Sequence, residues 1–187
     1  VVNYIDREQI KKDILKARRM MPDVIIACMH WGIEYRSLPE RSERDLADWM
    51  ITQGVDHVIG SHPHVLQPME VIQDKHTPAK HVVVYSLGNF ISNMSREHTD
   101  GGVMVKVVLG RKGLRRYIVS AQYSLIYSSR YKNEQGKEDI RVVPAASWLG
   151  KNQNSSFSVD SALIKYVNNT RLFLKGNNKE VEEYIFE

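Results

Sequence analysis

The sequence predicts an α/β domain, and three observations carry that prediction. Residues 24–60 alternate strand, loop, helix and strand, which is the pattern of a βαβ unit with parallel strands. Histidines follow both apolar runs of this unit, where the carboxyl ends of parallel strands meet. Further along, short apolar runs are separated by turn-forming residues. We therefore expect a βαβ unit, then mostly antiparallel strands, then carboxyl-terminal helices.

The first half of the chain carries clear start and stop signals for two helices. The first helix is expected to begin at Asp6, with Gln9 as its capping partner, and to end at Met21. The second is expected to begin at Ser42, with Asp45 three residues on, and to end at Gly54. Between the two helices, residues 24–29 form a near-continuous apolar run, which is typical of a strand buried on both faces. Residues 55–60 form the second strand. A right-handed crossover through the second helix makes the two strands parallel.

The second half changes character. Four apolar runs are expected to be strands: residues 67–72, 81–87, 102–109 and 114–126. Further expectations are a basic hairpin tip at 111–116, a polar loop at 128–136, and a stretch at 141–148 that is irregular or contains a short strand. We also expect a helix over 159–174 capped by Ser158 and a short acidic helix over 179–187. We divide the chain into a main part, residues 1–127, and an extension of the same domain, residues 128–187.

Composition narrows the class of protein. The 187 residues suit one domain, and the net charge of +4 comes from basic and acidic residues mixed along the chain, which argues against a nucleic-acid surface. The single cysteine, Cys28, lies in an apolar run and is expected to pack as a small hydrophobe. No apolar stretch is long enough to cross a membrane. The chain begins at Val1 rather than Met, and we expect it to belong to a longer gene product.

Three histidines are the candidate site. His62 and His64 are two residues apart, so in extended chain they point to the same side, and Pro63 disfavours helical geometry at His62. His30 ends the preceding apolar run. Imidazole is a ligand for zinc, manganese or iron, so convergence of the three predicts a metal site. The alternative is that the pair only terminates a strand, with Gly60 and Pro63 as turn residues.

Three segments together resemble the CapA-like family of capsule and poly-γ-glutamate biosynthesis proteins. They read MHWGIEY at 29–35, GVDHVIGSHPHV at 54–65 and YSLGNF at 85–90. The resemblance covers residues 2–109, and the family is similar to the calcineurin-like metallophosphoesterases. It implies the carboxyl-terminal part of an α/β/β/α sandwich with two divalent metal ions, Mn, Zn or Fe, at the strand ends.

The resemblance also implies roles for single residues. His30 matches a lone metal-binding histidine motif, and His62 and His64 match a terminal Gly-x-His-x-His motif. His30 and Glu34 are the expected catalytic residues, and Glu34 is alternatively a surface carboxylate. The expected substrate contacts are Trp31, Tyr35 and Asn89, where Asn89 alternatively holds a loop.

The chain departs from that superfamily because its first metal ligands, an Asp-containing motif and an Asn-His motif, have no match here. We therefore expect a sheet edge and an apolar face to be covered by a missing amino-terminal half or by a second copy. The leading functional hypothesis is a metal-dependent hydrolase-like domain that cleaves a phosphoester or a γ-glutamyl amide in capsule polymer synthesis or export. One alternative is a non-catalytic polymer-binding or scaffold subunit of a membrane synthase. Another is a sugar- or nucleotide-binding module. The resemblance implies an extracytoplasmic, membrane-associated location in bacteria.

Overall fold

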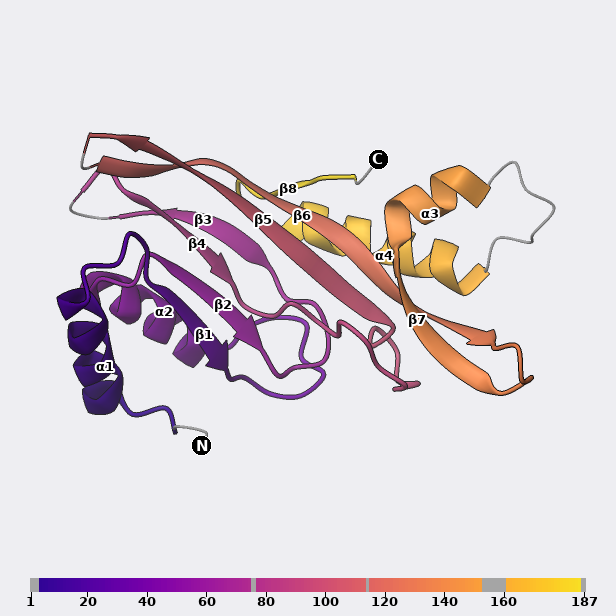
Figure 1. Ribbon diagram of the computed structural model, residues 1–187. Coiled ribbons are helices and arrows are strands. Elements are labelled where there is room, and N and C mark those ends of the chain that lie inside the picture. The colour runs from indigo at the N-terminus through magenta and orange to yellow at the C-terminus, as the bar shows by residue number, and fades with distance from the viewer. Residues whose placement is uncertain (1–3, 75–76, 114, 153–160, 186–187) are drawn as a thin grey trace.

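The first of two sheets carries the βαβ unit. The structure, a computed structural model, describes residues 4–74, 77–113, 115–152 and 161–185 (Figure 1). The first sheet has the order β1-β2-β4-β3. Its strands are β1 (Ile26–His30), β2 (His57–Ser61), β3 (Met69–Gln73) and β4 (Lys80–Val84). β1, β2 and β4 are parallel and β3 is antiparallel. The helices α1 (Arg7–Arg19) and α2 (Arg41–Gln53) cover one face of this sheet (Figure 1). The predicted α/β class is confirmed.

Local capping explains where both helices begin. Asp6 caps α1 as predicted, because its side chain accepts a hydrogen bond of 2.7 Å from the backbone N–H of Gln9. The predicted cap of α2, Ser42, is wrong. The cap is Glu40, whose backbone N–H donates to the side chain of Glu43 at 2.6 Å in a reciprocal capping box. The Ser42 hydroxyl instead donates to the same Glu43 carboxylate.

β1 is an edge strand, which corrects the expectation that it is buried on both faces. Its residues alternate between exposed and half-buried, and Ile26 is 54% exposed. Cys28 is exposed as well, so it does not pack as a core hydrophobe. Ala27 and Met29 pack on the opposite face against the helix side of the sheet. The apolar run therefore reflected one buried face, and not two.

The second sheet is antiparallel and holds the longest strands. β5 (Gly101–Lys112), β6 (Arg115–Lys132) and β7 (Glu138–Pro144) lie in that order, and β8 (Glu182–Glu183) pairs parallel with β6. The basic hairpin tip is found where β5 meets β6, and the side chain of Arg116 there pairs with Asp23. The helices α3 (Ala145–Asn152) and α4 (Ser161–Asn177) follow β7.

Three expectations for this half are wrong. The polar loop expected at 128–136 is mostly strand, because β6 continues to Lys132 and only a tight turn precedes β7. In residues 141–148, the short strand that the sequence left open is the end of β7, but the rest is the start of α3 and not an irregular stretch. Beyond residue 179, the described residues form no helix and include β8 where an acidic helix was expected. Ser158 and the expected start of α4 lie outside the described residues. The division at residue 127 falls inside β6.

The two sheets share one core. Val82 and Val84 of β4, Tyr123 and Leu125 of β6, and Leu174 of α4 belong to a single buried cluster. A second cluster lies between the first sheet and α1 and α2. The carboxyl-terminal segment ties the sheets together, because Lys179 pairs with β3 before β8 joins β6. In the described part of the chain, no helix is long and apolar enough to span a membrane.

Candidate functional site

The three histidines gather at the carboxyl edge of the parallel strands. His30 ends β1 and lies in register with Ser61, the last residue of β2, so His62 emerges beside it. The ring centroids of His30 and His62 are 4.4 Å apart, and those of His62 and His64 are 6.1 Å apart. His30 is exposed, while His62 and His64 are half-buried. Three imidazoles therefore border one patch of solvent-facing surface.

The backbone that presents these rings is strained. His62 and His64 have φ of 110° and 62°, so they are not in the extended conformation expected from the sequence. Tyr35 has φ of 66°, and its N–H donates to the carbonyl of Pro63 at 2.7 Å. This hydrogen bond ties the loop after β1 to the loop after β2. Such strain persists only where surrounding contacts enforce it, and it concentrates at functional sites.

Trp31 belongs to the core, which corrects its expected role as a substrate contact. It is 3% exposed, and its indole N–H donates to the backbone carbonyl of Tyr85 at 2.8 Å. Gly60 makes this contact possible, since a side chain there would overlap both the Tyr85 carbonyl oxygen and the Trp31 indole nitrogen. This hydrogen bond joins the residue after β1 to the residue after β4, and both groups lie against Gly60 of β2.

The Asn89 side chain is engaged within the protein. Its Nδ2 donates to the carbonyl of Thr99 at 3.0 Å, so its Oδ1 faces the Nδ1 of His64 at 3.1 Å. An amide oxygen only accepts, so Nδ1 of neutral His64 must carry the proton and Nε2 must keep its lone pair. Asn89 thus holds His64 and the segment around Thr99. This is the loop-holding role that the sequence left open, and the expected substrate contact of Asn89 stays a prediction.

Glu34, Tyr35 and Arg96 surround the outer side of His64. The Oε1 of Glu34, whose side chain is 51% exposed, lies 4.0 Å from the Nε2 of His64. The ring of Tyr35 lies 5.9 Å from the His64 ring, and the Arg96 guanidinium stacks over Tyr35 at 4.0 Å. Sequence reasoning missed Arg96. The available signal was its place in a charged run, seven residues after Asn89.

The histidines fit part of a metal-ligand set. Imidazoles at the spacing of His30 and His62 suit a borderline divalent cation, and the orientation of His64 leaves an unprotonated Nε2. However, within the described ranges no three His, Cys, Asp or Glu side chains are arranged to hold a metal ion.

Comparison with known proteins gives a consistent result. A family model described as "Bacterial capsule synthesis protein PGA_cap" matches residues 1–94, half of the chain. The PGA biosynthesis protein CapA of Bacillus subtilis (strain 168) is 36% identical over 98 residues, which are 52% of this chain and 24% of that relative. The capsule biosynthesis protein CapA of Bacillus anthracis is 33% identical over 91 residues, 49% of this chain and 21% of the relative. The chain thus covers about a quarter or less of these relatives.

Proposed function

The chain belongs to the bacterial capsule synthesis protein family PGA_cap, and on this premise we propose that it carries part of a metal-dependent hydrolase-like centre for a capsule polymer. The observation that carries the proposal is the convergence of His30, His62 and His64 on strained backbone at the carboxyl edge of a parallel sheet. That edge is where α/β proteins bind their ligands.

The proposed centre assigns a task to each residue. His30, His62 and the Nε2 of His64 would hold one or two divalent cations, Mn, Zn or Fe, together with ligands from elsewhere, and the cations would supply Lewis-acid polarisation of the scissile bond. Glu34 lies within reach of the same face and accepts a hydrogen bond from water or substrate. Asn89 keeps His64 in the orientation that exposes Nε2. The remaining ligands come from another part of the protein or from a second copy.

The proposed substrate is an anionic polymer or a small analogue of it. Phosphoesters and γ-glutamyl amides both develop negative charge on oxygen during cleavage, so the same Lewis-acid centre suits either. The names of the relatives, a PGA biosynthesis protein and a capsule biosynthesis protein, support a capsule polymer. We further propose that the chain works outside the cytoplasm beside a membrane synthase, a proposal that stands on the family alone.

Metal analysis of the purified chain tests the proposal. After incubation with Mn, Zn or Fe and removal of excess ions, we expect the native chain to retain metal and a His62→Ala/His64→Ala variant to lose it. His98→Ala is the matched control, because His98 is an exposed histidine outside the cluster. Equal metal content in all three proteins would contradict a metal role for the cluster.

A second candidate function is a non-catalytic, polymer-binding or scaffold subunit. It is favoured by the incomplete ligand set among the described residues. Polymer binding that persists in the presence of a chelator, by a chain that retains no metal, would support this function over hydrolysis. The sugar- or nucleotide-binding alternative loses support, because Trp31 is buried and Asn89 is engaged by His64 and Thr99.

A further inference from the structure

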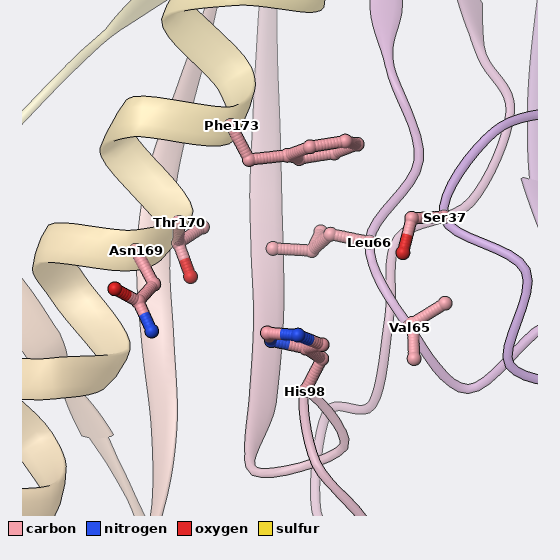
Figure 2. A pocket seen from close by; sticks show the side chains of 7 residues that line it. All are labelled: Ser37, Val65, Leu66, His98, Asn169, Thr170 and Phe173. Atoms are coloured by element: carbon pink, nitrogen blue, oxygen red, sulfur yellow. The ribbon is translucent and has the colours of Figure 1, made fainter.

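A hollow lies beside the histidine cluster, between residues 95–100 and α4. Its volume is about 450 Å³, and Arg96, Asp100 and Lys165 are among its lining residues. A smaller cavity of about 80 Å³ adjoins it, with Val65, Leu66 and Phe173 in its wall. The two share His98, Asn169 and Thr170. In Figure 2, the His98 ring lies beside Leu66 and faces the α4 side chains of Asn169 and Thr170.

The hollow is continuous with the candidate site. Val65 and Leu66 follow His64 directly in the chain. Arg96 lines the hollow while its guanidinium stacks over Tyr35, whose ring neighbours His64. The wall is also fixed to the site, because Asn89 binds both His64 and the carbonyl of Thr99. A ligand that reaches the histidines can therefore extend along this wall.

The charges in the hollow are mixed. Glu97 lies 3.9 Å from the ammonium of Lys165 and 4.0 Å from His98, so its charge is partly balanced. Within the described part of the chain, no carboxylate lies within ion-pair distance of Arg96, so its planar donors are available to a carboxylate of a ligand. Asp100 and Glu97 offer acceptors to N–H or O–H donors of the same ligand.

We propose that this hollow binds a segment of a polymer that carries both carboxylates and hydrogen-bond donors. This assignment rests on the proposed function and adds a substrate-binding site to it. Arg96 and Lys165 bind the carboxylates, and Asp100 accepts from the donors. An anionic chain without N–H or O–H groups, such as inorganic polyphosphate, offers no donor to Asp100 and Glu97. A volume of about 450 Å³ is in the usual range of ligand pockets.

Calorimetric titration of the whole chain, with chelator present, tests this site. The ligands are a short γ-linked oligoglutamate, whose donors are amides, an oligogalacturonate, whose donors are hydroxyls, and an inorganic polyphosphate, which has none. We expect at least one carboxylate oligomer to bind, and Arg96→Ala and Lys165→Ala each to weaken it about tenfold, because each loses a charge-assisted hydrogen bond. Lys12→Ala, an exposed cation on α1, should bind like the native chain.

The outcomes are separate from those of the metal test. Binding retained by the His62→Ala/His64→Ala variant supports the hollow even if the metal proposal fails. Absence of binding, equal binding of polyphosphate, or equal affinity of the Arg96 and Lys165 variants and the native chain would overturn the assignment. Both substituted side chains are exposed, and thermal unfolding of each variant verifies that it is folded. If Arg96→Ala disturbs the loop of residues 95–100, the affinity of Lys165→Ala on α4 still tests whether the hollow binds the polymer.

Discussion

The orientation of one histidine depends on one amide. Asn89 is the acceptor for Nδ1–H of His64, and it is fixed by its own donation to Thr99. Hydrogen-bond partners of this kind set the tautomer of a metal-binding histidine. Their substitution commonly weakens metal affinity by roughly 10–100-fold. The proposed metal site therefore depends on a residue that would not itself bind the metal.

Replacement of that amide gives the first prediction. In Asn89→Leu, His64 loses the acceptor for Nδ1–H, so we expect a mixture of tautomers in ¹⁵N NMR spectra of the ring and metal binding weakened about tenfold or more. Asn168→Leu, at an exposed position on α4, is the control and should leave both unchanged. An unchanged His64 tautomer in Asn89→Leu would show that Asn89 does not orient the ring.

A glycine beneath the site gives the second prediction. In Gly60→Ala, the new methyl group overlaps the Tyr85 carbonyl and the Trp31 indole, so the free energy of unfolding should fall by about 3 kcal/mol through overpacking. Gly176→Ala is the matched control, because that helical glycine in α4 has open space around its Cα and should gain up to ~1 kcal/mol. Urea unfolding measures both. A native-like stability of Gly60→Ala would contradict the close packing of Trp31.

At the scale of elements, a buried histidine joins two strands at the end of the sheet away from the site. His57 in β2 is 5% exposed, and its Nδ1 accepts a hydrogen bond of 3.1 Å from the N–H of Val82 in β4. Burial lowers the pKa of His57 below its ordinary value of 6.5, while neighbouring Asp56 raises it and His81 lowers it. The neutral ring is thus the form that the folded protein stabilises.

This linkage gives the third prediction. Because the folded protein holds His57 neutral, the unfolded chain binds more protons, and the stability that His57 contributes is present above pH 6.5 and is lost as the pH falls below it. Urea unfolding between pH 8 and pH 5 should therefore show a decline that becomes shallower in His57→Gln. If the free energy of unfolding of His57→Gln falls with pH as steeply as that of the native chain, His57 is not the source of the pH dependence.

The elements that could be predicted from the sequence are those fixed by neighbours in the chain. The Asp6 cap, the Gly54 helix end and the βαβ order are confirmed because each depends on a local pattern. The burial of Trp31 and the stacking of Arg96 on Tyr35 depend on residues more than fifty positions apart, which no local pattern encodes. The same holds for residues 128–132. Their polar side chains predicted a loop, but they continue β6 because they pair with β7.

At the scale of the whole molecule, the open edge at β1 has the clearest consequence. β1 ends the first sheet, and in the part of the chain that the structure describes no strand pairs with its outer side. Ile26 is 54% exposed on the face that also carries Cys28 and His30. An unpaired strand edge with apolar side chains is a template for another strand. We propose that another part of the protein or a second copy covers this edge when the protein functions. The edge ends at His30, so the covering segment would lie beside the proposed metal ligands.

The fourth prediction follows for the chain by itself. Light scattering after size-exclusion chromatography should give a mass above 21.6 kDa that rises with concentration, because copies pair through β1. Ile26→Lys adds charge to the edge and should return the mass to that of a monomer. Val119→Lys, at a 58% exposed position on β6, should not. A native chain that stays monomeric at high concentration would rule out self-pairing. If Ile26→Lys is monomeric and also loses metal, the missing ligands lie on the partner copy.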